Sequence, residues 1–188
     1  MVLKENVRSL LRIPFLNKHA IRRLNVLRDT PLGPLLSRLP IIGVIDVPIK
    51  GYGSLQIISD GLDSTATLLF WKGLRGYEPE VTRLFRELSK ASQTIIDIGA
   101  DTSFLTLLFS ILAPKATILA FEPAPDIFHR LEKNIEFNQC KNCTPFQIAI
   151  GNRTEKVELF IPRVKSVPMA ASLNKAFSGT VKRFKSPQ

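Results

Sequence analysis

The chain has 188 residues, a formal net charge of +10 and 45% hydrophobic residues, which suits one domain of ordinary size with enough chain for a core. The positive charge lies at the ends: residues 1–40 hold 8 Lys and Arg against 2 acids, residues 161–188 hold 6 against none, and the middle holds 12 against 14. Basic ends can contact nucleic acid or an anionic membrane surface, but solvated tails are the simpler expectation because the middle is nearly neutral.

The apolar stretches are too short to cross a membrane. The longest, Phe104–Pro114, is interrupted by Thr106 and Ser110, whereas a spanning helix needs about 20 apolar residues. Arg12 breaks the N-terminal apolar run and no small-residue cleavage site follows it, so no secretory signal is predicted. We therefore expect a cytoplasmic protein.

The first 75 residues predict an appendage in two parts. Residues 1–40 predict basic amphipathic helices over 4–11 and 18–27, followed by a proline-rich connector. Residues 41–75 predict a β-hairpin lead-in, with strands Ile41–Ile49 and Ser54–Ser59 joined across Gly-Tyr-Gly, and then a further strand over Ala66–Trp71.

Residues 76–162 alternate helix and strand patterns, which predicts an α/β domain with a parallel sheet. Pro79 opens a helix with an apolar face, flanked by acids that favour a helix start. The run Thr94–Ile98 is apolar enough for a central strand, and Phe104–Leu112 predicts the helix after it. The apolar positions of the first helix are Val81, Leu84, Phe85 and Leu88.

The second half of this domain continues the alternation. A strand ends near Glu122, and a helix from Asp126 repeats Ile127, Leu131 and Ile135 at helical spacing. A third strand is predicted over Thr144–Ile150, where Pro145 indicates the edge of the sheet because proline donates no ladder hydrogen bond. A half-buried strand is predicted over 156–161, and residues 163–188 form a basic tail.

Asp97, Gly99 and Glu122 have the positions of a nucleoside-cofactor site. Gly99 lets the backbone of a turn approach a ligand after the first strand, and Glu122 ends the second strand 25 positions after Asp97, which fits one βαβ unit. A carboxylate there can accept both hydrogen bonds of a ribose diol. Asp97 could instead brace the turn, and Glu122 could be a solvated strand end.

The run 97–106, Asp-Ile-Gly-Ala-Asp-Thr-Ser-Phe-Leu-Thr, resembles motif I of FkbM-type S-adenosylmethionine methyltransferases, usually Asp-Ile-Gly-Ala-Asn-x-Gly-x-x-Thr. The resemblance covers about residues 55–175 and is specific as a set. Its further segments are Phe70–Gly73, Tyr77–Glu80, Ala120–Pro123, Leu131–Asn134 with Asn138, and Ala149–Asn152.

The resemblance implies a Rossmann-like sheet, S-adenosyl-L-methionine as cofactor and a small-molecule or sugar hydroxyl as methyl acceptor. Asp97 and Gly99 would shape the methionine end of the pocket, Glu122 would hold the ribose, and Gln147 would lie near the adenine. The other cofactor-turn residues are Ala100, Asp101 and Thr106. No catalytic side chain or metal ligand is identified, because the sulfonium is already activated and the enzyme mainly aligns the acceptor.

Two residues of the cofactor turn depart from the family pattern. Asp101 stands where the family has Asn, and Ser103 stands where it has Gly. A carboxylate at 101 would repel the methionine carboxylate but could pair with the ammonium, and the Cβ of Ser103 narrows a space that glycine leaves open. Alternatively, Asp101 or Thr102 caps the following helix.

The resemblance also implies strands that the sequence does not supply. The family sheet has seven strands, of which only the first three are recognised here, and no Asp-x-Glu-Gly-type fourth-strand motif follows. We expect an incomplete sheet, the amino-terminal portion of a methyltransferase. Its first strand would expose an apolar edge and invite self-association or a complementing chain.

Two other functions stay open. A βαβ unit with an acid on its second strand also suits an NAD(P)-dependent oxidoreductase half, although the G-x-G-x-x-G phosphate turn is absent and Asp101 would repel a pyrophosphate. A non-catalytic cofactor-binding remnant or interaction module is the other alternative. Cys140 and Cys143 form a single Cys-x-x-Cys after a predicted helix, too few ligands for zinc and unlike a redox motif that opens a helix, so we expect incidental thiols.

Overall fold

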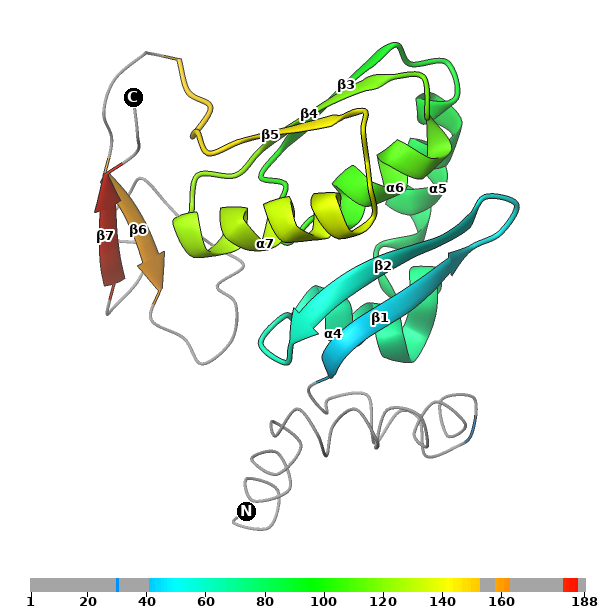
Figure 1. Ribbon diagram of the computed structural model, residues 1–188, viewed down its shortest axis with the longest axis horizontal. Coiled ribbons are helices and arrows are strands. Elements are labelled where there is room, and N and C mark those ends of the chain that lie inside the picture. The colour runs from blue at the N-terminus through cyan, green and yellow to red at the C-terminus, as the bar shows by residue number, and fades with distance from the viewer. Residues whose placement is uncertain (1–29, 31–40, 153–157, 163–180, 186–188) are drawn as a thin grey trace. The chain divides into compact units, whose positions relative to one another are not determined.

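The computed structural model describes residue 30 and residues 41–152, 158–162 and 181–185 (Figure 1). The chain divides into two compact units, Met1–Leu84 and Phe85–Gln188. The helices predicted over 4–11 and 18–27 and the connector before residue 41 lie outside the described residues. No helix in the described part of the chain is long and apolar enough to span a membrane.

The first unit contains the predicted β-hairpin. Strands β1 (Ile42–Ile49) and β2 (Gly53–Asp60) pair antiparallel along their whole length. Alternate side chains of both strands are buried, as period-two alternation requires. The turn closes with a 2.9 Å hydrogen bond from the Tyr52 amide to the Ile49 carbonyl, and glycines at 51 and 53 supply its positive φ angles of 84° and 92°.

The strand predicted over Ala66–Trp71 is wrong, because these residues belong to helix α4 (Ser64–Lys72). Asp63 caps its start by accepting a 3.0 Å hydrogen bond from the Ala66 amide, and Gly73 ends it at a φ of 59°. A short apolar run is ambiguous between strand and helix, and here the two caps decide the outcome. A 3₁₀ turn, η2 (Gly73–Gly76), follows.

Helix α5 (Pro79–Ser89) begins at the predicted proline. The ring of Phe85 packs edge to face on Phe109, with ring centroids 5.4 Å apart. Leu84 and Leu88 are more than half exposed, so the predicted apolar face of this helix is only partly covered.

The second unit contains a parallel sheet of three strands, β3 (Thr94–Ile98), β4 (Thr117–Phe121) and β5 (Cys143–Phe146), in the order β3-β4-β5. Helix α6 (Phe104–Leu112) joins the first two strands and α7 (Pro125–Phe137) joins the last two. This arrangement confirms the predicted α/β class and the Rossmann-like βαβαβ order. The strands follow one another across the sheet in chain order. Because both crossover connections are right-handed, α6 and α7 lie on the same face of the sheet (Figure 1).

The ends of this unit differ from the prediction. β5 stops at Phe146 instead of Ile150, although Pro145 lies on the edge strand as expected. A separate antiparallel pair, β6 (Glu158–Pro162) and β7 (Val181–Lys185), follows. β6 confirms the last predicted strand over its described residues, whereas β7 lies within the stretch predicted to be a tail.

One face and one edge of the parallel sheet are open within the described residues. Ile118 and Ala120 are fully buried beneath the helices, whereas Ile96 and Ile98 on the other face are 59% and 63% exposed. In the described part of the chain β3 pairs only with β4, so its outer edge has no strand partner. The apolar edge expected from the sequence is therefore present.

Candidate functional site

The turn after β3, residues 99–101, which we call the Gly99 turn, is held by the end of β4. The amides of Gly99 and Ala100 donate to the Phe121 carbonyl at 2.9 and 3.0 Å. The next amide, that of Asp101, donates to Oε2 of Glu122 at 3.1 Å. All three amides of the turn are therefore used inside the protein.

Glu122 links the Gly99 turn to the start of α7. Its Oε1 accepts a 2.9 Å hydrogen bond from the Ala124 amide, and its own amide donates to the Phe146 carbonyl at 3.0 Å. The residue is only 6% exposed. The alternative of a solvated strand end is thus wrong, and the carboxylate lies against the Gly99 turn.

Asp97 lies near the C-terminal end of β3 and faces α6. Its Oδ2 accepts a 2.6 Å hydrogen bond from the hydroxyl of Thr106, which is fully buried. Asp97 itself is 8% exposed. Burial raises the pKa of its carboxyl above the ordinary value, and the Thr106 hydrogen bond opposes that rise.

The two buried acids influence each other. Burial also raises the pKa of Glu122; the hydrogen bonds from the Ala124 and Asp101 amides oppose the rise, and the charge of Asp97 adds to it. Among the described residues, both carboxylates accept only neutral donors and neither forms an ion pair. Buried charges are normally paired, so this site favours a positively charged ligand.

The loop between the Gly99 turn and α6 has an unusual backbone. Asp101 and Ser103 have φ angles of 49° and 102°, which residues other than glycine rarely adopt. Ser103 is fully buried, and its hydroxyl has no hydrogen-bond partner among the described residues. Asn tolerates this backbone region and Gly adopts it freely, whereas Ser103 holds it with a Cβ in place.

Neither Asp101 nor Thr102 occupies the N-cap position of α6. Ser103 occupies the N-cap position and makes no side-chain cap bond. Asn134 of α7 instead holds this loop, because its Nδ2 donates to the Thr102 carbonyl at 2.9 Å. Asn134 is 1% exposed, and its helical spacing after Leu131 is the signal that could have identified it as a buried polar residue.

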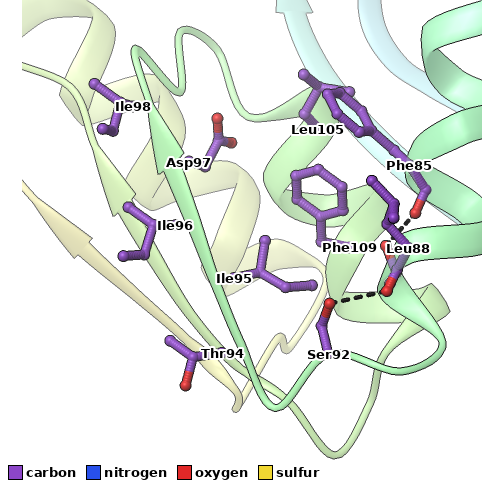
Figure 2. A pocket seen from close by; sticks show the side chains of 11 residues that line it. Phe85, Leu88, Ser92, Thr94, Ile95, Ile96, Asp97, Ile98, Leu105 and Phe109 are labelled. Carbon is purple, nitrogen blue, oxygen red and sulfur yellow. Dashed lines mark hydrogen bonds between the residues drawn. The ribbon is translucent and has the colours of Figure 1, made fainter.

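A cavity of about 440 Å³ lies beside the open edge of β3, between that strand, α5 and α6 (Figure 2). Its wall is mostly apolar, and Phe85, Leu88 and Phe109 lie opposite Ile95 (Figure 2). Asp97 is the one predicted site residue in its lining. The cavity is therefore adjacent to the Gly99 turn but does not contain it.

Six of the seven predicted cofactor residues lie together around the Gly99 turn. Gln147 makes no side-chain hydrogen bond to them within the described residues; it follows Phe146, whose carbonyl accepts a hydrogen bond from the Glu122 amide. The grouped residues are Asp97, Gly99, Ala100, Asp101, Thr106 and Glu122.

Comparisons with known proteins match parts of the chain. No protein-family model matches it. Over 71 residues it is 32% identical to Methyltransferase 1 of Beauveria bassiana (strain ARSEF 2860), which covers 37% of the chain and 28% of that relative's length.

Two solved structures are similar to parts of this chain, with lower sequence identity. One is precorrin-6y C5,15-methyltransferase from Geobacter metallireducens GS-15, with a TM-score of 0.33 and 21% identity over 38% of this chain and 39% of that one. The other is the N-terminal domain of human METTL16 in complex with SAH, with a TM-score of 0.31 and 19% identity over 44% and 36% of the two chains. Similarity at these TM-scores carries no functional weight.

Proposed function

We propose that the second unit is the S-adenosylmethionine-binding part of an FkbM-type methyltransferase that acts on a hydroxyl of a small molecule or sugar. The observation that carries the proposal is the pair of buried carboxylates, Asp97 and Glu122, at the tips of adjacent parallel strands without a cationic partner among the described residues. The motif resemblance and the partial match to a methyltransferase support the same function.

The residues fit the cofactor chemically. S-adenosylmethionine carries a sulfonium and an ammonium cation, and when bound it supplies an activated methyl group. Each ionised carboxylate oxygen has two acceptor sites, so Glu122 keeps capacity for ribose hydroxyls beyond its two amide bonds. No atom lies within 4 Å of the position that a Cβ would take at Gly99. The turn therefore leaves space for a ligand beside the acids.

The same geometry disfavours a dinucleotide. A glycine-rich phosphate loop binds pyrophosphate with free backbone amides. Here the amides of Gly99, Ala100 and Asp101 already donate hydrogen bonds to the Phe121 carbonyl and the Glu122 carboxylate. Two buried carboxylates would also repel a pyrophosphate. These contacts support the methyltransferase proposal over the oxidoreductase one.

Titration calorimetry of the full chain with S-adenosylmethionine, S-adenosylhomocysteine and NAD tests the proposal. We expect both adenosyl compounds to bind and NAD not to bind. Glu122→Gln should weaken binding about tenfold, equivalent to ~1.4 kcal/mol. Glu132→Gln is the matched control, because this glutamate is exposed on α7 beside His129 and should leave affinity unchanged. Tight binding of NAD, or equal affinity of both variants, would contradict the proposal.

The pH dependence of binding provides a second test. Because burial raises the pKa values of Asp97 and Glu122, both acids take up protons at a higher pH than ordinary carboxyl groups do. Affinity for S-adenosylmethionine should therefore fall as pH is lowered from neutrality through the raised pKa values. S-adenosylhomocysteine lacks the sulfonium charge and should lose less affinity over the same range.

Methyl transfer is measured separately, with methyl-labelled cofactor and a panel of sugar and small-molecule alcohols. Incorporation of label into an alcohol would support the enzyme. Cofactor binding without transfer to any alcohol would favour the alternative of a non-catalytic binding remnant.

A further inference from the structure

The Cys-x-x-Cys segment lies in an ordered turn between α7 and β5. Helix α7 ends in a Schellman motif, in which Gln139 has a φ of 54° and the Cys140 amide donates to the Ile135 carbonyl at 3.1 Å. The chain then turns again, and the Cys143 amide donates to the Cys140 carbonyl at 3.3 Å. Cys140 and Cys143 are therefore the first and last residues of one hydrogen-bonded turn.

This turn brings the two Cα atoms into the range of separations that a disulfide spans. The first and last Cα atoms of a β-turn lie within about 7 Å, and disulfides span Cα separations of about 4.4 to 6.8 Å. Both cysteines are free and half-buried, so no covalent bond ties either sulfur elsewhere. The Cys140 thiol donates to the Asn138 carbonyl at 3.9 Å. The Cys143 thiol lies 4.0 Å from the Thr106 carbonyl and 3.8 Å from Oδ1 of Asn142. The expectation of incidental thiols rested on the position of the motif after a helix, which does not prevent the turn from pairing them.

Asn142, between the two cysteines, fixes the turn against α6. Its Nδ2 donates to the carbonyls of Ala113 and Ala116 at 3.2 and 3.1 Å, and its Oδ1 accepts from the Ser110 hydroxyl at 2.6 Å. A turn anchored in this way loses little further freedom when its ends are linked.

We propose that Cys140 and Cys143 form a reversible intramolecular disulfide, a redox site that reacts with low-molecular-weight disulfides. The Cys140 thiolate attacks one sulfur of the oxidant, forms a mixed disulfide and releases one thiolate. The Cys143 thiol then gives up its proton and attacks the Cys140 sulfur, forming the internal bond and releasing the second thiol. The protein loses two electrons, and the oxidant is reduced to two thiols.

The surroundings assign the two roles. The nearby Cys143 thiol lowers the pKa of Cys140, against the effect of burial. The nearby Cys140 thiol raises the pKa of Cys143, as do burial and the charges of Cys140 and Asp97. Because the thiolate is the nucleophile, Cys140 attacks first and Cys143 resolves the mixed disulfide. This site does not depend on the proposed methyltransferase function.

The test equilibrates the reduced full chain in mixtures of reduced and oxidised glutathione, quenches it with acid, alkylates the free thiols and measures the intact mass. The chain has only 2 Cys, so each product is unambiguous. We expect a monomer that lacks two hydrogens and takes up no alkylating agent. Two alkylated thiols at every ratio, or only disulfide-linked dimers, would overturn the proposal.

Single variants and unfolding separate the site from ordinary thiol chemistry. Cys143→Ser should accumulate one glutathione adduct at Cys140, and Cys140→Ser should form its adduct about tenfold more slowly. In urea the equilibrium constant of the internal disulfide should fall at least about tenfold, a shift of ~30 mV, because the turn is lost. Equal rates in the two variants, or an unchanged equilibrium in urea, would contradict the assignment.

Discussion

The β1–β2 hairpin and the Gly99 turn follow local backbone rules to different degrees. In the hairpin, side chains alternate between buried and exposed and the positive φ angles of the turn fall on glycines. In and after the Gly99 turn, positive φ angles fall on Asp101 and Ser103, and two acids are buried close by. Strained and uncompensated groups of this kind concentrate at functional sites. The hairpin thus serves stability, whereas the Gly99 turn has features that stability alone would not select.

The largest expected effect is in the hairpin, with Leu55→Ala. Leu55 is fully buried on β2, and truncating such a side chain costs about 2–5 kcal/mol because it leaves a cavity. Val44→Ala on β1 is the matched control, since Val44 is 46% exposed and should cost less than ~1 kcal/mol. Both are measured by urea unfolding. If Leu55→Ala also weakened cofactor binding as strongly as Glu122→Gln does, the assignment of stability to the hairpin and of binding to the Gly99 turn would be wrong.

Thr106→Val tests the acid beside the Gly99 turn. The change keeps the shape of the side chain but removes the donor to Asp97, so near neutral pH it should cost about 2 kcal/mol, the value of a hydrogen bond to a charged group. Losing the donor raises the pKa of Asp97 further. The folded state therefore gains stability by proton uptake as pH falls, and the cost of the variant should shrink in mildly acidic buffer.

Thr67→Val is the control in the other region. The Thr67 hydroxyl donates to the backbone carbonyl of Asp63, the N-cap of α4. This bond involves no charge, so its removal should cost under ~1 kcal/mol at every pH. Unfolding curves of both variants at two pH values give the comparison. A cost for Thr106→Val that does not change with pH would mean that Asp97 is not the group concerned.

The contrast between the two regions also explains what could be predicted from sequence. The hairpin, β3, β4 and both sheet helices follow from hydrophobic periodicity and turn residues, because local preference and burial agree there. Helix α4 is not predictable from its apolar run alone, because a cap at Asp63, outside that run, decides between helix and strand. The strand β7 was missed because its pairing with β6 is nonlocal.

At the site, the positions of the residues can be predicted from sequence but their hydrogen bonds cannot. The spacing from Asp97 to Glu122 predicts two adjacent strand tips, and the acids lie there. That Glu122 already binds the amides of Asp101 and Ala124 depends on side-chain direction, which spacing does not encode. The only sequence signal for the left-handed backbone at Ser103 is that the methyltransferase motif usually has glycine at this position.

Ser103→Gly should stabilise the protein by about 1 kcal/mol, because it relieves a left-handed backbone and removes a buried hydroxyl without a partner, against a smaller entropic cost. It should also strengthen S-adenosylmethionine binding, since the Cβ of Ser103 narrows the space beside the Gly99 turn. Gln139→Gly is the matched control: Gln139 is also left-handed, so the change should stabilise by a similar amount without altering affinity. Thermal unfolding and calorimetry measure both. Destabilisation by Ser103→Gly would show that the serine is needed for packing.

The smallest effect on stability is expected at the open edge of the sheet, with Ile98→Lys. Ile98 is 63% exposed on β3, the strand whose outer edge has no partner among the described residues, so the change should alter the free energy of unfolding by less than about 0.5 kcal/mol. It should nevertheless reduce self-association, because a charge blocks pairing of the edge with a second copy of the chain. Val44→Lys adds the same charge to the exposed face of the hairpin and should leave association unchanged. Sedimentation velocity over a range of concentrations distinguishes these outcomes, and equal association of both variants would locate the contact away from β3.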